Sequence, residues 1–494
     1  MMKKLSLLLL LFSLAIAQEH NLIREYTMTR LAGVDNPARI TGTEYSDQQQ
    51  YGVLTTYGTG DFRLPFQPEE HWYLDYFTAG NKRLFDRGVF SGYVAFHQHQ
   101  LGNKKWVHNR NPYFGLPFLL ADSSVGDMSL NGIHWQLGYS QEIIDDKLAL
   151  GGRLFYNVDE EMKSVFPKPI IKHRDMMLTL GVSSQIVEQF SAGMTYSYFN
   201  FQEIMNTSKY SLDQDKTPLF FKIRGLDNPI IFRGETSEER QQDFIGHNLK
   251  IDSKITNWLV REMNLSAEYE TGSVVVVDGG AYPVDQGTMD VNNLYFSGDM
   301  ILPLYQENCL RVSAFGEKRL HNATHPDIDI EIFEYKKEQL AGQAELILPV
   351  GRRIVLMPGL FGVSAFTKRI DKFNGVLGYF PATQLGGSLG LRLSWAEKFI
   401  SQWKLAYAST EVTDDKNFTE RSDWYYNEIT TIEQAWFRAD HQSLRIDADL
   451  RYRTGMNSWV VLDLHYYQTT AVSGDFESTD RTFLSAAIKL ELRK

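Results

Sequence analysis

The sequence predicts an all-β fold, a single transmembrane antiparallel β-barrel of about 18 strands (16–18) with short periplasmic turns and long extracellular loops. Three observations predict it. Many segments alternate apolar and polar side chains, and the connections between these segments alternate in length. The chain also begins with an export signal, yet no later apolar run is long enough for a spanning helix.

The clearest alternation runs from Leu444 to Arg453. Every second side chain is apolar and every intervening one is charged, and a period of two belongs to an extended strand. Each arginine turned toward lipid at mid-membrane would cost about 2–4 kcal/mol, so the charged face must line an enclosed hollow. A soluble β-sandwich would also alternate, but its strands usually have about 5–6 residues, whereas these reach the roughly 9–11 residues of a membrane-crossing strand.

The same pattern predicts the other strands, with ends uncertain by a few residues. They are expected at 48–57, 71–79, 88–98, 127–141, 148–157, 174–185, 189–200, 244–255, 259–271, 290–300, 308–318, 332–348, 352–366, 384–396, 399–411, 440–453, 457–470 and 481–493. Long connections follow at about 99–126, 158–173, 201–243, 272–289, 319–331, 367–383, 412–439 and 471–480. If there are eighteen strands, this alternation places both chain ends in the periplasm and every long loop outside.

The beginning of the chain predicts export. Residues 1–17 are expected to be a cleaved signal peptide, because Lys3 and Lys4 precede an apolar run that ends in Ala15-Ile16-Ala17. Residues 18–47 are expected to form an N-terminal periplasmic segment and residues 48–494 the outer-membrane β-barrel. No later apolar run approaches the roughly 20 residues of a spanning helix. The predicted location is therefore the cell outer membrane, with its lipid as a partner.

The composition argues against some classes of function. The formal net charge of −11 argues against nucleic acid as a partner. The single cysteine, Cys309, cannot close an internal disulfide. Tyrosine and tryptophan recur near the ends of the predicted lipid faces, where amphipathic rings suit the membrane interfaces. These residues are Tyr139, Tyr156, Tyr198, Tyr269, Trp395, Tyr407, Tyr452 and Tyr466.

One region resembles a known family. The chain reads Pro117-Phe118-Leu119-Leu120-Ala121-Asp122-Ser123-Ser124-Val125-Gly126-Asp127, then Gly138-Tyr139-Ser140 and Gly151-Gly152-Arg153-Leu154-Phe155-Tyr156. This is similar to an uncharacterised family of Bacteroidota outer-membrane β-barrels, a domain of unknown function. The resemblance implies a signal peptide and a barrel that runs to the C-terminus. It implies a location and a fold, and no activity.

Three motifs invite a chemical interpretation. Gly386-Gly387-Ser388-Leu389-Gly390 matches a nucleophile elbow, but the apolar alternation continues through it, so we expect a strand whose glycines leave room for an inward-projecting loop. His97 and His99 share one strand face, with His108 nearby, yet no acidic residue in that segment completes a metal site. The carboxylates at 327, 329 and 331 lack the glycine turn of a calcium loop. We therefore predict no metal site, no cofactor and no catalytic residues.

The charged strand supplies the candidate site. Candidate lumen-lining and solute-binding residues are Arg445, Asp447, Asp449, Arg451, Arg453, Asp463, His465 and Arg392. Opposite charges on adjacent strands can pair laterally. Two roles remain open: an ion-pair network that stiffens the wall, or a polar surface that selects solutes.

These features predict a non-enzymatic barrel that acts as a conduit or a binding and transport module for a small solute. Barrels of this size enclose a water-filled interior unless it is plugged. The bulky loops 99–126, 201–243 and 412–439 could fold inward and gate it. The alternative is an outer-membrane subunit of a secretion or surface assembly, which binds protein partners through these loops. A membrane hydrolase with its site at the rim is the least favoured alternative.

Overall fold

The structure is a computed structural model. It describes residues 36–42, 47–84, 87–207, 220–226, 229–232, 239–257, 259–279, 282–305, 307–395, 398–413 and 424–493. The expected signal peptide lies outside the described residues, as do residues 18–35 and 43–46 of the expected N-terminal segment.

The strands of the wall account for most of the described chain. They are β1 (Gln48–Gly60), β2 (Glu70–Leu84), β3 (Gly88–Val107), β4 (Phe118–Ile144), β5 (Leu148–Lys163), β6 (Ile170–Val187), β7 (Phe190–Asn206), β10 (Glu239–Ile255), β11 (Glu262–Asp278), β12 (Val284–Pro303), β13 (Cys309–Thr324), β14 (Glu331–Val350), β15 (Ile354–Asp371), β16 (Val376–Trp395), β17 (Phe399–Val412), β18 (His441–Arg453), β19 (Ser458–Ala471) and β20 (Asp480–Arg493). The shorter β8 (Phe220–Arg224) and β9 (Pro229–Phe232) form a hairpin that adds to β4.

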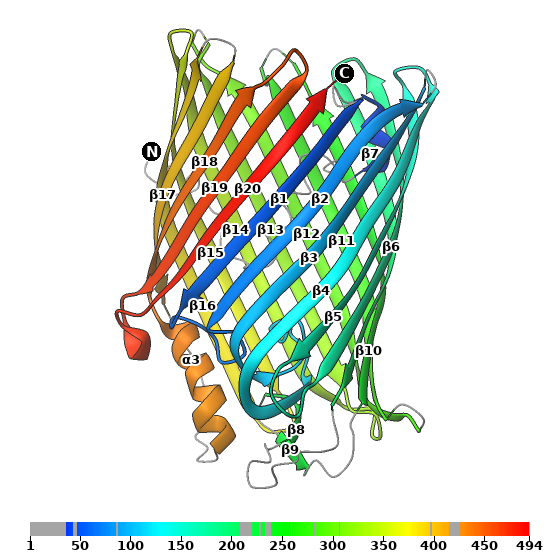
Figure 1. Ribbon diagram of the computed structural model, residues 1–494, viewed down its shortest axis with the longest axis vertical. Coiled ribbons are helices and arrows are strands. Elements are labelled where there is room, and N and C mark those ends of the chain that lie inside the picture. The colour runs from blue at the N-terminus through cyan, green and yellow to red at the C-terminus, as the bar shows by residue number, and fades with distance from the viewer. Residues whose placement is uncertain are drawn as a thin grey trace.

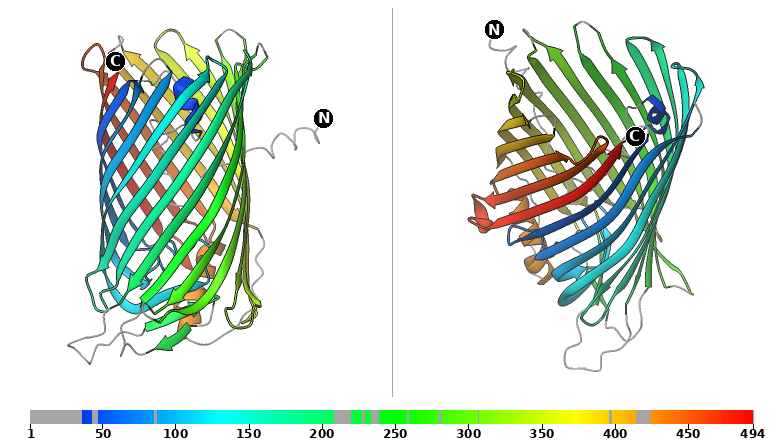
Figure 2. Two further views of the ribbon diagram at one scale, coloured as in Figure 1. Left: turned by 90° about the vertical axis from the view of Figure 1, so that its right-hand side faces the viewer. Right: turned by 45° about the horizontal axis from the view of Figure 1, so that its top comes forward.

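The wall closes on itself. Each strand pairs antiparallel with its sequence neighbours, β7 pairs with β10, and β1 pairs with both β2 and β20. In the closing pair, Gln48 lies opposite Arg493 and Val53 lies opposite Ile488. The described residues therefore form a closed antiparallel barrel of 18 strands, as the alternation predicts. Figure 2 shows this ring of tilted strands from the side and obliquely from one end.

The two ends of the barrel differ, and we name them by their connections. At the turn end, short connections join the strands, and β1 begins beside the C-terminal end of β20. At the loop end lie the long connections, the β8–β9 hairpin and helix α3 (Thr431–Arg438), which follows the single π-helical turn η3 (Tyr426–Thr430). Figure 1 shows the turn end at the top and the loop end at the bottom.

Several strands extend further toward the loop end than the alternation predicts. β4 begins at Phe118 rather than near residue 127, and β11 continues through Val274 and Val276 to Asp278. Here the inner face packs against other protein instead of water, so both faces carry apolar side chains and the period of two disappears.

The outer face carries the apolar set that the alternation assigns to lipid. Ile446 and Tyr452 of β18 are exposed on the outside, whereas Arg445 and Asp447 line an internal cavity. Of the predicted interface aromatics, the most exposed are Tyr139, Tyr269, Trp395, Tyr407 and Tyr452. This is the surface expected of a barrel that is surrounded by hydrocarbon between two aromatic girdles.

The helical elements are short. Besides α3 and η3, the described chain contains two 3-10 turns, η1 (Pro37–Gly42) and η4 (Gly474–Phe476). Within the described residues, none of the helices has both the length and the apolar character needed to cross a bilayer.

Arginine substitutions on opposite faces of β17 should differ sharply. Leu405 is exposed on the outer face, and its neighbour Ala406 lines the internal cavity. We expect Leu405→Arg to lower the free energy of unfolding by about 2–4 kcal/mol, because it places a cation in hydrocarbon. Ala406→Arg should cost under about 1 kcal/mol, because its charge meets the aqueous interior. Urea unfolding in lipid vesicles measures both, and equal losses would contradict the assignment of faces.

Candidate lumenal site

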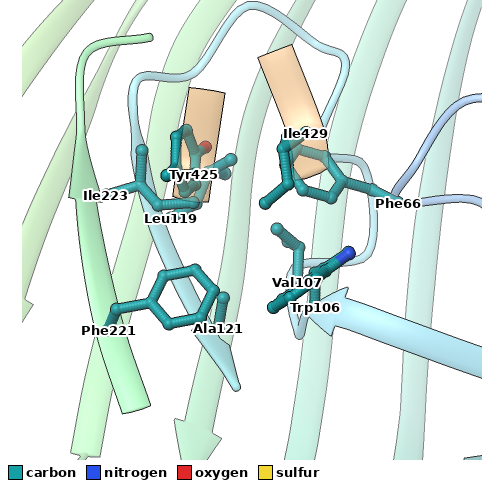
Figure 3. Packing of buried hydrophobic residues seen from close by; sticks show 9 residues of the cluster. All are labelled: Phe66, Trp106, Val107, Leu119, Ala121, Phe221, Ile223, Tyr425 and Ile429. Carbon is teal, nitrogen blue, oxygen red and sulfur yellow. The ribbon is translucent and has the colours of Figure 1, made fainter. Parts of the chain in front are cut away.

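A cap fills the loop end of the barrel. One of its apolar clusters joins four sources: the β1–β2 connection, strands β3 and β4, strand β8, and the segment that leads into α3. The buried residues are Phe66, Trp106, Val107, Leu119, Ala121, Phe221, Ile223, Tyr425 and Ile429. Figure 3 shows these side chains converging from separate elements. Parts of all three bulky loops that the sequence suggested could turn inward therefore lie in the cap.

The connection 108–117 crosses the lumen. It leaves the wall at β3, and its ring at Phe114 contacts Phe244 of β10 and His321 of β13. Gly115 lies so close to Tyr335 of β14 that an added Cβ would stand 2.7 Å from the ring. The chain therefore spans from β3 to strands on the far side of the ring, and we call residues 108–117 the crossing segment.

Arg110 ties the crossing segment to the wall. Its Nη1 lies 3.1 Å from Asp159 Oδ2 of β5 and 3.5 Å from Asp175 Oδ2 of β6. Its backbone N–H donates to Glu203 of β7. The Asp159 side chain is completely buried, so it depends on such partners for charge compensation. His97 and His173 also face Asp159.

A second buried group of charges anchors the start of the crossing segment. Lys163 Nζ lies 3.1 Å from Asp122 Oδ1, and His108 Nε2 lies 3.0 Å from Asp122 Oδ2. Lys104 of β3 pairs at 3.3 Å with Glu161 of β5, two strands away. Burial lowers the pKa of the His108 imidazole below its ordinary value, although Asp122 opposes that shift. His108 is therefore neutral at pH 7, and Lys163 supplies the positive charge that compensates Asp122.

Helix α3 is held against the opposite part of the wall. Arg369 Nη1 of β15 lies 2.9 Å from Glu433 Oε2 of α3. Phe437 stacks on Phe380 of β16 at 4.7 Å between ring centroids.

The Tyr113 hydroxyl of the crossing segment accepts a hydrogen bond from the Phe66 backbone. Burial, reinforced by Glu433, raises the pKa of that hydroxyl, so it stays protonated.

The turn end has a lumenal element of its own. The segment 36–42, with η1, lies against the inner faces of β3, β4, β5 and β6, and Figure 2 shows it inside the ring. Arg39 Nη2 lies 2.5 Å from Asp252 Oδ1, and Ser140 donates to the Ala38 carbonyl. A Cβ at Gly181 would stand 2.3 Å from Asn36 Oδ1, so this close approach requires glycine.

Beneath the cap lies a cavity of about 1190 Å³. It is lined by nine lysine and arginine side chains but by five carboxylates. Several of the carboxylates that compensate these cations lie behind them, outside the lining: Asp159, Glu161, Glu317, Glu345 and Glu433. The cavity surface therefore presents positive charge, although the chain as a whole carries −11.

The predicted site residues occupy this lumen in part. The cavity is lined by Arg445, Asp447, Asp463 and His465. Their ion pairs run mostly along the strands: Arg445 Nε pairs with Asp447 at 2.8 Å and Arg451 Nε with Asp449 at 2.8 Å. Across strands, His465 Nδ1 lies 2.8 Å from Asp447, and Lys489 lies 2.5 Å from Asp463.

Lateral pairing is therefore less complete than the sequence suggested. Asp449 lies directly opposite Asp463, so two carboxylates face each other in that register and each takes a cation elsewhere. Arg453 bonds to turn carbonyls at Gly455 and Met456. Asp449, Arg451, Arg453 and Arg392 are outside the cavity lining.

The structure shows where the other sequence motifs lie. Ser388 lies within the continuous strand β16, so the elbow interpretation fails there. A Phe361 ring from β15, and not an inward loop, occupies the space beside Gly386, where a Cβ would stand 2.4 Å from the ring. His99 lies 3.2 Å from Asp75. In the part of the chain that the structure describes, no group of three or more His, Cys, Asp or Glu residues could hold a metal ion.

Sequence reasoning missed the most tightly held charges. Lys104, Arg110 and Lys163 fall outside the predicted alternating strands, so no period marked them as inward-facing. A weak signal was available, because Asp159, Glu161 and Lys163 keep the two-residue spacing beyond the predicted end of their strand at 157.

The comparisons with known proteins concern the fold. The siderophore receptor PiuA from Acinetobacter baumannii is 9% identical over 89% of this chain and 81% of its own, with a TM-score of 0.43. BauA, the ferric preacinetobactin receptor from Acinetobacter baumannii, is 7% identical over 91% and 80%, with a TM-score of 0.47. The CymD monoaromatic hydrocarbon channel is 10% identical over 93% and 91%, with a TM-score of 0.31.

No curated protein is detectably similar to the chain. A family model does match it, over residues 40–492, which covers nearly the whole barrel and the end of the lumenal segment 36–42. The family is described only as one of unknown function, in agreement with the resemblance seen in the sequence. The chain therefore belongs to the family of unknown function DUF6850.

Proposed function

We propose that the protein is an outer-membrane solute conduit, closed at its extracellular end by the crossing segment and helix α3. The loop end would face the outside and the turn end the periplasm, because barrels of this class put their long loops outside. The observation that carries the proposal is the crossing segment itself. It bridges a lumen that also contains a cavity of about 1190 Å³ lined by charged side chains.

The way the crossing segment is held favours a movable closure. Ion pairs and ring contacts fasten it, through Arg110 at one side and Phe114 at the other, and no strand pairing runs between residues 108 and 117. Such contacts can be exchanged for water without breaking the barrel's hydrogen-bonded wall, and lumenal gates of this kind act through local rearrangement.

The test compares conductance with and without the bulk of the crossing segment. In one variant, residues 111–116 are replaced by a Gly-Ser stretch of equal length, which removes the rings at Tyr113 and Phe114. A matched control replaces residues 327–330, an exposed loop at the same end. In planar lipid bilayers, the first variant should conduct continuously, and the control should match the mostly closed wild type.

Folding of each variant is verified first, by showing that the unheated protein resists denaturation in detergent. The proposal is overturned if folded protein lacking the crossing-segment rings neither conducts ions nor releases small solutes trapped in vesicles. It is also overturned if the control replacement opens the barrel as widely, because closure would then not depend on the crossing segment.

A further inference from the structure

The inner wall of β13 and β14 carries two cations side by side. Arg319 lies directly opposite Lys337 in the antiparallel register, and Glu317 lies directly opposite Gln339 in the next row. Like charges in this arrangement repel each other across the strands. Both cations line the cavity, so their shared surroundings are the lumen and not the lipid.

One carboxylate serves both cations. Glu317 forms an ion pair with the Arg319 guanidinium, and Lys337 Nζ lies 3.4 Å from Glu317 Oε1. Glu317 is buried in the wall, only 5% exposed, and is outside the cavity lining. The group Arg319–Glu317–Lys337 thus carries one surplus positive charge, and it presents that charge toward the lumen. Glu270 also lines the cavity two strands away, where its carboxylate accepts a hydrogen bond from Asn293 and attracts Arg319 over a longer distance.

A neutral donor completes the site. Gln339 also lines the cavity and is 5% exposed, and its Nε2 has no hydrogen-bond partner among the described residues. Burying an amide N–H₂ without an acceptor is unfavourable, and native proteins rarely tolerate it without a reason. The guanidinium, the ammonium and the amide N–H₂ line the same cavity, and each of these groups donates hydrogen bonds and accepts none.

We propose that Arg319, Lys337 and Gln339 form a binding subsite for an oxyanion, the carboxylate or phosphate group of a small solute. The planar guanidinium can bind two oxygens of such a group, and the ammonium adds a compact charge. The Arg319 guanidinium also lies 5.8 Å from the centre of the Tyr295 ring, which also lines the cavity and gives the subsite an aromatic edge. Chloride is a single atom and cannot offer the guanidinium two oxygens.

The subsite lies against the closure. In the next row toward the loop end, Tyr335 and Arg369 are register partners, with Gly115 of the crossing segment against the Tyr335 ring and Glu433 of α3 paired with Arg369. A solute held by Lys337 therefore stands directly below both closing elements. This placement on a solute path rests on the proposed conduit function, whereas binding of the oxyanion itself does not.

The experiment measures binding to purified full-length protein in detergent by calorimetry, at constant ionic strength. The probes are inorganic phosphate and citrate, which separate phosphate from carboxylate preference. Lys337→Met should weaken binding of the preferred probe at least tenfold. It removes the surplus positive charge and leaves the neutral Arg319–Glu317 pair, so no unpaired charge remains in the wall. Gln339→Leu should weaken binding about threefold or more, and Lys337→Arg should retain most of it.

The matched control is Lys404→Met, which removes another cavity-lining lysine and therefore the same single positive charge. It should bind the probes within twofold of wild type. An equal loss in this control shows a diffuse charge effect and overturns the subsite, as does the absence of binding of either probe at millimolar concentration. Binding without conductance would reject the conduit and support the subsite. Conductance without binding would reject the subsite and support the conduit.

Discussion

Replacing Arg110 with alanine is expected to open the barrel. The substitution removes the contacts at 3.1 Å and 3.5 Å to Asp159 and Asp175, and it leaves the buried Asp159 carboxylate without its arginine. Breaking a buried ion pair by removing one partner costs about 3–5 kcal/mol. Even the lower value would raise the open population on the order of 100-fold, since about 1.4 kcal/mol corresponds to a factor of ten.

Open probability in planar bilayers is the measurement for this variant. The control is Arg87→Ala, which breaks an exposed pair with Asp145 at the turn end, where a loss of at most about 1 kcal/mol is expected. The control should therefore conduct like wild type. If Arg110→Ala stays closed while the barrel remains folded, the ion pairs of Arg110 do not hold the crossing segment in place.

Lys163→Met is expected to cause the largest loss of stability. Lys163 is almost completely buried, and its ammonium contacts both Asp122 and the Ser124 carbonyl. With methionine at 163, the buried Asp122 carboxylate keeps only His108 and Ser124 as close partners, and burial lowers the pKa of the His108 imidazole, so protonating His108 to compensate Asp122 costs free energy. We expect the free energy of unfolding to fall by about 3–5 kcal/mol.

Urea titration of the protein in vesicles provides the measurement, with the midpoint as the readout. The double variant Lys163→Met with Asp122→Asn should recover most of the loss, because no unpaired charge then remains in the wall. A single variant as stable as wild type, or a double variant no better than the single, would show that the pair does not stabilise the cap.

The predicted candidate site stays a prediction, and the structure shows where its residues lie. Arg445 and Asp447 of β18 and Asp463 and His465 of β19 line the lumen because each pair lies on the polar face of an alternating strand, a pattern that is visible in the sequence. The register that sets Asp449 against Asp463 could not be read, since it depends on how two strands align across a turn. For this reason the ion pairs follow the strands more often than the sequence suggested.

The subsite on β13 and β14 is a second feature that the sequence alone does not determine. The alternation alone puts Arg319 and Lys337 on strands, but it does not say that they stand opposite each other or that Glu317 serves both. Nothing local in the sequence marks Gln339 as a donor without an acceptor. These are properties of two aligned strands and a cavity, and they appear only when the wall is closed.

The positions of the strands, their two faces and the closed barrel follow from the sequence. The side-chain period of two is a local property of each strand, and in hydrocarbon such strands satisfy all their backbone hydrogen bonds only in a closed barrel. The cap, the crossing segment and the shared carboxylate at Glu317 follow only from the tertiary structure. They depend on contacts across the lumen, such as that between Phe114 and His321, whose residues are far apart in the chain and carry no common period. Such contacts form only after the ring has closed and brought its opposite walls within reach of one loop.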